Sequence, residues 1–576
     1  MKKISHLFYI QLVICIFTGC AEKRTTDDTF KTICNPINIS YRFCLNEPSR
    51  REAADPSCVL FNDEYYLFAS VSGGYFHSYD LITWDLIVTE DLPIEDYAPT
   101  AVEIDNELYF MTSANGSRSI YKTADPKSGR WQLVTDQLPF SATDPMLFLD
   151  DDGRVYYYFG CSDHLPIMAV ELDRNNSLYP IGIPVECFNS QREKYGWEQP
   201  GDYNELDKSP WIEGAWMNKQ NGKYYLQYSS PGTEYKSYAD GVYLSDQPLG
   251  PFTLAKVNPF AAKVGGFVNG AGHGCTFEDR YGNFWHFGTA TISVKHDFER
   301  RLSLFPVFFD TDDEMAAYTG FGDYPMIIPD KKVSDIKTLF PGWMLLSFNK
   351  KVEVSSVLEN YPAQNAVNED IRTYWSAKTG NKGEFISIDL EENCTINAVQ
   401  INFAEQDGNI FGRQEGIYHQ YLLEYSLNGK KWKTLIDKSN NTTDIPHDYV
   451  QLSTPVNARF VRLTNIKIPD GKFAISGLRI FGNSNKKPAD ATTNVNIERQ
   501  SNDRRIVKIS WDVCAGATGY NIRFGNQPDK LYQNYMVYGQ NELVIRSLNT
   551  ETPYFFAIDS FNEAGITEGK VSDIIL

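Results

Sequence analysis

The chain has 576 residues, a length that allows three domains. Its formal net charge is −20, from 54 basic and 74 acidic residues, which argues against nucleic acid or an anionic membrane surface as a partner. Aromatic residues make up 14% of the chain, a composition typical of β-rich proteins.

The N-terminus has the pattern of a secretion signal. Two lysines precede an apolar stretch, Leu7 to Phe17, and small residues then lead to Cys20. This stretch is too short to span a bilayer, and the whole pattern resembles a bacterial lipoprotein signal. We therefore expect a signal peptide over residues 1–19, a lipidated Cys20 and a polar tether over residues 20–40. The protein would then lie in the cell envelope, lipid-anchored at the outer membrane, on its periplasmic side or on the cell surface.

Ten cysteines are present; Cys15 lies in the signal, Cys20 follows it, and the other eight are scattered. No Cys-x-x-Cys pair occurs, so a zinc site is not expected. Cys34 and Cys44 could form a disulfide in an oxidising compartment, or remain as buried free thiols.

Five segments of the first 300 residues repeat one pattern: a strand, a tight turn and an aromatic strand. In the clearest copy, Trp211 to Ser229, the pair Asn221-Gly222 supplies the positive φ angles of a hairpin turn. The other copies are residues 59–68, 102–110, 146–159 and 276–287. Such repetition, with about four short strands a unit, predicts a five-bladed β-propeller. A large antiparallel sandwich is the alternative.

Four polar residues share a register within these repeats. Asp144, Glu213 and His273 each precede the glycine of the following turn by nine residues. Asp55 precedes the matching turn position by eight. Equivalent positions on successive blades surround the propeller axis, so these side chains should converge at one end of it. Carboxylates without local basic partners are costly to bury, which marks a candidate catalytic site.

These residues stand in recognisable motifs. Ala54-Asp55-Pro56, Thr143-Asp144-Pro145, Ile212-Glu213-Gly214 and Gly272-His273-Gly274 resemble the motifs of glycoside hydrolase family 43. The resemblance implies a five-bladed propeller that acts on arabinose, xylose or galactose linkages. It implies that Asp55 is the general base that activates water and Glu213 the general acid. Asp144 would orient the acid and raise its pKa.

Four residues are candidates for contact with the substrate. The resemblance places His273 near a water-coordinated ion, often calcium, in the propeller channel; no cofactor is required for the chemistry. Arg301 is the choice for the positive charge that family members place near a catalytic carboxylate. Tyr75 and Trp197 are candidates for stacking on a sugar ring. Tyr75 could instead pack between blades, and Trp197, which lies in a long insertion over residues 184–210, could instead anchor a solvent loop.

The composition changes near residue 346. Segments such as Ala363 to Trp375 and Tyr425 to Trp432 resemble a discoidin-type (coagulation factor 5/8) β-sandwich. Such modules often bind sugars and a structural calcium. Gly477 stands where many of them carry a glutamate ligand, a departure that argues against calcium here. Segments such as Val507 to Trp511 resemble a fibronectin type III sandwich, which we interpret as a spacer.

The predicted fold class is therefore all-β, a five-bladed β-propeller followed by two β-sandwich domains. The expected domains are the propeller over residues 41–335, the discoidin-like sandwich over 346–484 and the fibronectin-like sandwich over 488–576.

The resemblance implies an inverting glycoside hydrolase, and a deep pocket at the propeller axis would favour exo-action. We therefore expect an exo-acting enzyme that releases a terminal pentose from plant-type polysaccharide or oligosaccharide. An α-L-arabinofuranosidase is the first choice, and a β-xylosidase or a β-galactofuranosidase or galactosidase are the alternatives. An endo-acting hydrolase with an open cleft is a third interpretation, and a non-catalytic glycan-binding lipoprotein comes from a different class. The expected partners are a polysaccharide or oligosaccharide and, through the lipid anchor, a membrane. We expect no nucleic acid, and a monomer.

Overall fold

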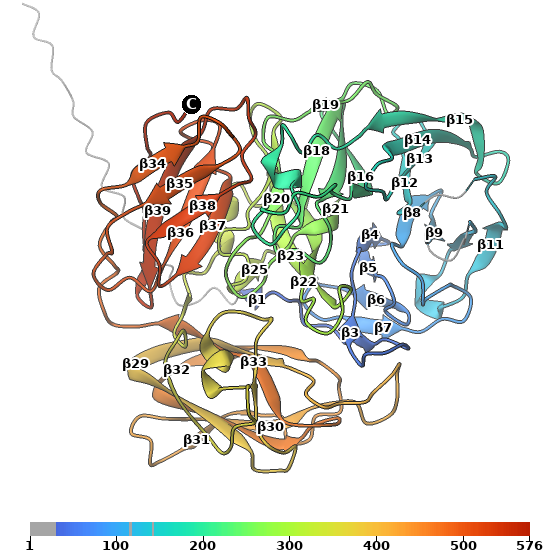
Figure 1. Ribbon diagram of the computed structural model, residues 1–576. Coiled ribbons are helices and arrows are strands. Elements are labelled where there is room, and N and C mark those ends of the chain that lie inside the picture. The colour runs from blue at the N-terminus through green and yellow to red at the C-terminus, as the bar shows by residue number, and fades with distance from the viewer. Residues whose placement is uncertain (1–29, 114–117, 141–142) are drawn as a thin grey trace, which may run out of the picture.

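The computed structural model describes residues 30–113, 118–140 and 143–576 (Figure 1). The predicted signal peptide, Cys20 and the first part of the tether lie outside these residues. Within them the chain forms β-strands and a few short 3₁₀ turns, without an α-helix. No helix in these three ranges is long and apolar enough to cross a membrane.

Residues 57–317 form five sheets of antiparallel strands, in which each strand pairs with the next along the chain. The first two sheets are β4 (Ser57–Phe61), β5 (Glu64–Phe68), β6 (Tyr75–Ser78) and β7 (Asp85–Ile87), then β8 (Thr100–Ile104), β9 (Glu107–Met111), β10 (Ile120–Thr123) and β11 (Gln132–Thr135). The third is β12 (Met146–Leu149), β13 (Val155–Phe159), β14 (Ile167–Asp173) and β15 (Tyr179–Phe188). The fourth is β16 (Glu213–Gln220), β17 (Lys223–Ser230), β18 (Ala239–Ser245) and β19 (Thr253–Leu254), with β20 (Ala261–Ala262) beside β18. The fifth is β21 (Gly272–Glu278), β22 (Phe284–Thr291), β23 (Arg300–Phe309) and β24 (Met315–Ala317).

The first strands of the five sheets, β4, β8, β12, β16 and β21, contact one another in a closed ring. Each sheet is therefore one blade around a common axis, which confirms the five-bladed propeller (Figure 1). The aromatic second strands bury their rings between blades, as Tyr157 in β13 and Tyr225 in β17 do with full burial. The Tyr-rich strands thus pack neighbouring blades against one another.

Two short strand pairs bring the N-terminal segment onto the propeller. Strand β1 (Lys31–Ile33) pairs with β25 (Met326–Ile328), which follows the fifth blade. Strand β2 (Arg42–Phe43) pairs with β3 (Arg51–Glu52), just before the first blade. The second pair matters for the site because β3 contributes side chains to it.

The next part of the chain is a second all-β domain, at the bottom of Figure 1. Its strands are β26 (Met344–Leu345), β27 (Lys351–Val354), β28 (Trp375–Ser376), β29 (Phe385–Phe403), β30 (Gln420–Ser426), β31 (Lys433–Asp437), β32 (His447–Lys467) and β33 (Ala474–Asn483). They are hydrogen-bonded into one sheet of eight strands. The two longest, β29 and β32, pair with register shifts, which let the sheet bend around its apolar core.

The last part is a sandwich of two sheets. One contains β34 (Asn496–Arg499), β35 (Val507–Ser510) and β38 (Glu542–Ile545); the other contains β36 (Gly519–Gly525), β37 (Gln533–Tyr538), β39 (Phe555–Asn562) and β40 (Gly565–Thr567). Apolar side chains of both sheets share one cluster, including Ile509 and Ile522. The predicted sandwich is present, and its fibronectin type III character stays a prediction.

The three parts pack against one another through one apolar cluster. Phe321 and Tyr324, which follow the fifth blade, contribute to it from the propeller. The ring of Phe321 lies 5.5 Å from that of Phe561 in β39, and the ring of Tyr324 lies 5.6 Å from that of Phe481 in β33. Both sandwiches are therefore fixed against the propeller by shared aromatic packing.

Gly477 in β33 has a packing reason at this interface. A Cβ atom there would lie 2.7 Å from the ring of Phe267 and 3.2 Å from the amide nitrogen of Asn402. The absence of a side chain lets the propeller ring approach the sheet of the second domain. A glutamate could not occupy this position without moving the interface.

Candidate active site

The candidate residues lie where the innermost strands begin, and the backbone there has a repeated conformation. Asp55, Ala98, Asp144 and His273 have φ angles of 51°, 46°, 53° and 41°, and Gly214 has 62°. Residues other than glycine seldom adopt this left-handed region, and strain of this kind persists where the surrounding fold imposes it. Each blade therefore turns toward the axis through one left-handed residue.

Asp55 precedes β4 and is held as an ionised carboxylate. Its Oδ1 accepts a hydrogen bond from an Nη atom of Arg300 at 2.8 Å, and its Oδ2 accepts one from the hydroxyl of Ser70 at 2.6 Å. The side chain is only 4% exposed. Burial acts to raise the pKa of Asp55, but the charges of Arg300 and His273 outweigh it and lower the pKa below its ordinary value.

Arg300, rather than Arg301, supplies the positive charge at this carboxylate. Arg300 also binds Glu52 of β3, with an Nη atom 2.6 Å from Oε1, so it bridges two buried acids. Successive side chains of a strand point to opposite faces. Arg301 consequently points away from Asp55.

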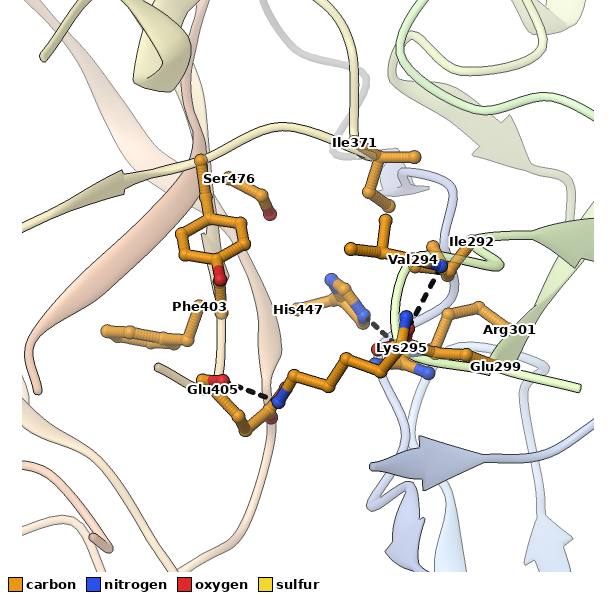
Figure 2. Close-up of a pocket in the computed structure, with 12 residues that line it drawn as sticks. Ile292, Val294, Lys295, Glu299, Arg301, Ile371, Phe403, Glu405, His447 and Ser476 are labelled. Carbon is orange, nitrogen blue, oxygen red and sulfur yellow. Dashed lines mark hydrogen bonds between the residues drawn. The ribbon is translucent and has the colours of Figure 1, made fainter. Parts of the chain in front are cut away.

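The structure thus corrects our expectation for Arg301. Its Nε donates to Nε2 of His447 at 2.9 Å, and an Nη atom donates to the carbonyl oxygen of Arg51. Figure 2 shows Arg301 and His447 beside the small pocket where the propeller meets the second domain. Arg301 is an interface residue.

His273 links the two aspartates. Its Nδ1 lies 3.3 Å from Oδ1 of Asp55 and 3.7 Å from Oδ2 of Asp144. Burial acts to lower the pKa of His273, but the neighbouring carboxylates, led by Asp55 and Asp144, raise it overall. The imidazole is therefore favoured as a cation, which stabilises the ionised form of the acids beside it.

The calcium ion implied by the family resemblance has one candidate contact at this histidine. Nδ1 of His273 is engaged by the two aspartates, and no protein partner of Nε2 is found in the described part of the chain. Calcium prefers a shell of six to eight oxygen ligands. The imidazole could contact such an ion only through water, so the channel calcium stays a prediction.

Asp144 and Glu213 form the second acidic centre, with the thiol of Cys161 between them. One ligand atom from each of these three residues lies within 4.8 Å of the others. Burial is the main cause that raises the pKa of Asp144, to about 7. The charge of His273 acts to lower this pKa, whereas the charges of Glu213 and Asp55 act to raise it. Asp144 therefore keeps its proton up to about that pH, beside the carboxyl of Glu213.

Two further donors hold Glu213, neither of them evident from the sequence motifs. The hydroxyl of Tyr238 donates to Oε1, and the thiol of Cys161 donates to Oε2 at 3.1 Å. Burial, followed by the charges of Asp144 and Glu213, raises the pKa of Cys161 far above its ordinary value, so the thiol stays protonated. These donors fix the direction in which the Glu213 carboxyl points.

The structure places the two candidate stacking residues in the core. Tyr75 in β6 is fully buried and its ring stacks on Phe68 at 4.8 Å. Trp197 lies in the 3₁₀ turn η3 (Gly196–Glu198), is 1% exposed and contacts Tyr228 at 5.3 Å between ring centres. Neither ring is available to a sugar, so Tyr75 packs between blades and Trp197 anchors its insertion, the alternative considered for each.

The eight cysteines of the described residues are free thiols. Cys34 contacts the carbonyl oxygen of Asp323, and Cys44 contacts Glu52. Burial is the main cause that raises the pKa of each thiol to about 12. Of the two alternatives for this pair, the structure shows buried thiols.

An ionised carboxylate near two further carboxyl groups, one of them protonated up to about pH 7, at the axis of a five-bladed propeller, is an arrangement that suits a glycoside hydrolase. Residues 48–315 match the family described as Glycosyl hydrolases family 43, and residues 351–480 match the F5/8 type C domain. The chain therefore contains a family 43 glycoside hydrolase domain followed by an F5/8 type C domain.

Individual relatives are distant. The chain is 26% identical over 235 residues to a beta-D-galactofuranosidase of Aspergillus niger, which covers 35% of this chain and 63% of that protein. It is 25% identical over 261 residues to a beta-xylosidase of Xylanibacter ruminicola, which covers 35% of this chain and 78% of that protein. A crystal structure of a family 43 protein from Bacillus licheniformis is 14% identical, with a TM-score of 0.41 over 94% of this chain and 91% of that one.

Proposed function

We propose that this chain is an exo-acting, inverting glycoside hydrolase that releases a terminal pentose from plant-type polysaccharide or oligosaccharide. An α-L-arabinofuranosidase is the first choice. The observation that carries the proposal is the division of protonation states at the axis. Asp55 is ionised beside Arg300, while Asp144, which lies beside Glu213, keeps its proton to about pH 7.

In the proposed reaction, the protonated carboxyl of Glu213 gives its proton to the glycosidic oxygen as the bond to the anomeric carbon breaks. Asp55 takes a proton from a water molecule, whose oxygen attacks that carbon from the opposite face. Asp144 lies within 4.8 Å of the acid, and we assign it the role of orienting Glu213. His273 and Arg300 keep the charge of Asp55 compensated. One water is consumed, and the configuration at the anomeric carbon inverts.

The sugar is the open part of the proposal. The relatives' names include beta-D-galactofuranosidase and beta-xylosidase. An arabinoxylan arabinofuranohydrolase of Paenibacillus polymyxa is 31% identical over 162 residues, covering 25% of this chain and 24% of that protein. A β-xylosidase or a β-galactofuranosidase is therefore kept as the second candidate.

The proposal is tested by incubating the protein with a panel of aryl furanosides and pyranosides, beside the variants Asp55→Ala and Glu213→Ala. We expect one sugar to be released and kcat to fall by about 10²–10⁴-fold in each variant, the range that a general acid or base contributes. Asp152→Ala, which removes an exposed carboxylate in a blade turn, is the matched control. Activity that survives Asp55→Ala would refute the assigned base.

The products separate the remaining alternatives. Proton NMR of the first product formed reports whether the anomeric configuration inverts. Monosaccharide products from an oligosaccharide support exo-action, whereas longer products support an endo-acting enzyme. Binding to polysaccharide without turnover on any substrate would favour a non-catalytic glycan-binding protein. Elemental analysis of the purified protein tests for the channel calcium.

We also propose that Cys20 carries a lipid that anchors the protein in the cell envelope. The support is the basic start, the short apolar stretch and the small residues before Cys20. Metabolic labelling with a radioactive fatty acid should mark the wild-type chain and leave Cys20→Ala unlabelled. Labelling of both, or of neither, would contradict the anchor.

A further inference from the structure

Tyr238 is a buried phenol that contacts the proposed general acid. It comes directly before β18 of the fourth blade and is fully buried. Its hydroxyl donates a hydrogen bond to Oε1 of Glu213, at the start of β16 in the same blade. Burial is the main cause that raises the pKa of Tyr238 well above its ordinary value, and the charge of Glu213 adds to it. The phenol therefore keeps its proton and acts as a donor.

Backbone contacts hold this ring in one position. The amide nitrogen of Tyr238 donates to the carbonyl oxygen of Tyr235 at 3.1 Å, and the carbonyl oxygen of Tyr238 accepts from the amide nitrogen of Ala271 at 2.9 Å. A Cβ atom on Gly272 would lie 2.7 Å from the ring. The ring thus lies directly against the backbone at the start of β21, where glycine leaves room for it. Its hydroxyl group is therefore fixed relative to Glu213.

The two oxygens of the Glu213 carboxyl have different surroundings. Oε1 faces Tyr238, which is fully buried, whereas Oε2 accepts from the thiol of Cys161, which is half-buried, at 3.1 Å. The chain beyond Cys161 reaches the surface, since His164 and Leu165 are exposed. A thiol is also a weaker donor than a phenol, so it is the partner that a substrate oxygen can replace. Oε2 is therefore the oxygen on the side from which a substrate approaches.

The difference between these partners also determines which oxygen carries the proton. In a protonated carboxyl group, the oxygen without the proton is the better hydrogen-bond acceptor. The strong donor on Oε1 of Glu213 therefore favours Oε2 as the protonated oxygen. The same arrangement thus places the acidic proton on the oxygen that the substrate can reach.

We propose that Tyr238 is a positioning residue for the general acid, and this role rests on the proposed function. The proton passes from Oε2 of Glu213 to the glycosidic oxygen, and that oxygen takes the electron pair of its bond to the anomeric carbon. Glu213 is left as a carboxylate, whose Oε1 still accepts from Tyr238. Hydrogen bonds to ionised acceptors are stronger than those to neutral ones, so this contact strengthens as the proton leaves. Tyr238 consequently stabilises the transition state more than the ground state.

The test compares two substrates of the same sugar that differ in their need for an acid. A 2,4-dinitrophenyl glycoside has a leaving group that departs as a stable anion, whereas a methyl glycoside has one that must be protonated. We expect Tyr238→Phe to lower kcat on the methyl glycoside by about 10–100-fold, the range expected for one hydrogen bond to a charged group. On the dinitrophenyl glycoside kcat should stay within about threefold of the wild type, because that step needs no general acid.

Tyr228→Phe is the matched control. Tyr228 is also fully buried and lies in β17 of the same blade, and its hydroxyl donates to Oε1 of the buried Glu198 at 2.6 Å. The change removes an equivalent bond between a phenol and a carboxyl group that is not part of the catalytic set. The ratio of kcat on the two substrates should therefore equal that of the wild type. Glu213→Gln, which removes the acid itself, should show the same selective loss as Tyr238→Phe but a larger one.

Four results would contradict this role. An equal loss on both substrates in Tyr238→Phe would show that the tyrosine is only structural, and a selective loss in Tyr228→Phe would show that the effect is not specific to the site. A larger selective loss in Cys161→Ala than in Tyr238→Phe would reverse the assignment of the two oxygens. Absence of turnover of any glycoside by the wild type would overturn the proposed hydrolase and this role with it. Turnover by the wild type without a selective loss in Tyr238→Phe would overturn the role of Tyr238 alone.

Discussion

At the scale of single residues, two acids at one propeller axis are held in opposite protonation states. Arg300 and His273 lower the pKa of Asp55, whereas burial and like charge raise that of Asp144 to about 7. Activity should therefore be highest at a pH where Asp55 is ionised and Asp144 is still protonated. It should fall above about pH 7, where Asp144 loses its proton, and in acid, where Asp55 becomes protonated.

Arg300→Lys should displace the acid limb of this pH profile upward. A lysine cannot bridge Glu52 and Asp55 with a planar fork, so Asp55 loses part of the charge that lowers its pKa. We expect the acid limb of kcat/KM to rise by about one pH unit, within the range known for an acid beside an arginine. Arg301→Lys, which alters the neighbouring interface residue, is the control. An unchanged acid limb in Arg300→Lys would show that Arg300 does not tune the base.

Asp144→Asn should make the propeller more stable at pH 8 while it reduces activity. The carboxyl has an ordinary pKa of 3.8 and one of about 7 in the folded chain, so the unfolded chain releases its proton first as the pH rises. Asp144 therefore opposes folding increasingly from about pH 4 to 7, with an upper limit of about 4 kcal/mol above pH 7. Thermal unfolding of both proteins at pH 4 and pH 8 checks this. A lower melting temperature for Asp144→Asn at pH 8 would contradict the raised pKa.

The sequence predicts those site residues that share the periodicity of the repeats. Asp55, Asp144 and His273 are brought together because turn spacing fixes blade register. The choice between Arg300 and Arg301 depends on which face of β23 meets the axis, and that follows from the pairing with β22 rather than from any motif. Trp197 was unpredictable for another reason, since its insertion folds back into the core.

At the scale of elements, the start of β16 shows how closely the blades meet. A Cβ atom on Gly214 would lie 2.8 Å from the imidazole of His273 and 2.8 Å from the hydroxyl of Ser229. The catalytic strand can therefore pass the fifth blade only with glycine at this position.

Gly214→Ala should displace His273 and lower kcat by at least about tenfold. Gly222→Ala is a matched control because Gly222 also has a positive φ, of 78°, but nothing lies within 4 Å of its would-be Cβ. Both variants are destabilised by about 1–2 kcal/mol, because alanine is unfavourable at a positive φ. Only Gly214→Ala also brings a Cβ atom into contact with His273. Equal activity of the two variants, measured on the same aryl glycoside, would mean that the contact with His273 is unimportant.

The strands themselves were predictable because aromatic alternation and Asn-Gly or Asp-Gly turns are local signals. The long strands β29 and β32 were less predictable, because each bends at register shifts, and the sequence of a bent strand resembles that of several short strands. Gly477 illustrates the limit: its motif context suggests a missing ligand, whereas its cause is a ring from another domain.

At the scale of the whole molecule, the second domain is joined to the active site through β3. The side chain of Arg51 is fully buried and binds Glu405 at 2.6 Å and Asp444 at 2.7 Å, both in the second domain. The next residue, Glu52, binds Arg300, which binds Asp55. Arg51 at the interface and Glu52 in the site are adjacent in the chain, and Arg300 connects Glu52 to the proposed base, Asp55.

Arg51→Ala should destabilise the chain by about 3–5 kcal/mol, because it leaves two largely buried carboxylates, 10% and 13% exposed, without this partner. Arg459→Ala removes a half-exposed pair with Asp389 and should cost no more than about 1 kcal/mol. Denaturant unfolding of both variants, followed by activity at a temperature where both are folded, checks the coupling. A stability loss in Arg51→Ala no larger than in Arg459→Ala would show that the interface ion pairs are dispensable. Such contacts between distant segments have no local sequence signal, so they could not be predicted.

The second blade has the same left-handed backbone conformation near the axis, but the residue there, Ala98, has no polar side chain. Ala98 has the same backbone conformation as Asp55 and Asp144, and it is only 3% exposed. Each of the five blades therefore has one left-handed residue near the axis, and three of these residues carry a polar side chain, whereas the second blade has Ala98 and the fourth has Gly214. The backbone conformation at these positions is thus independent of the side chain. A protein engineer could place a new acid or base at Ala98 without redesigning the backbone.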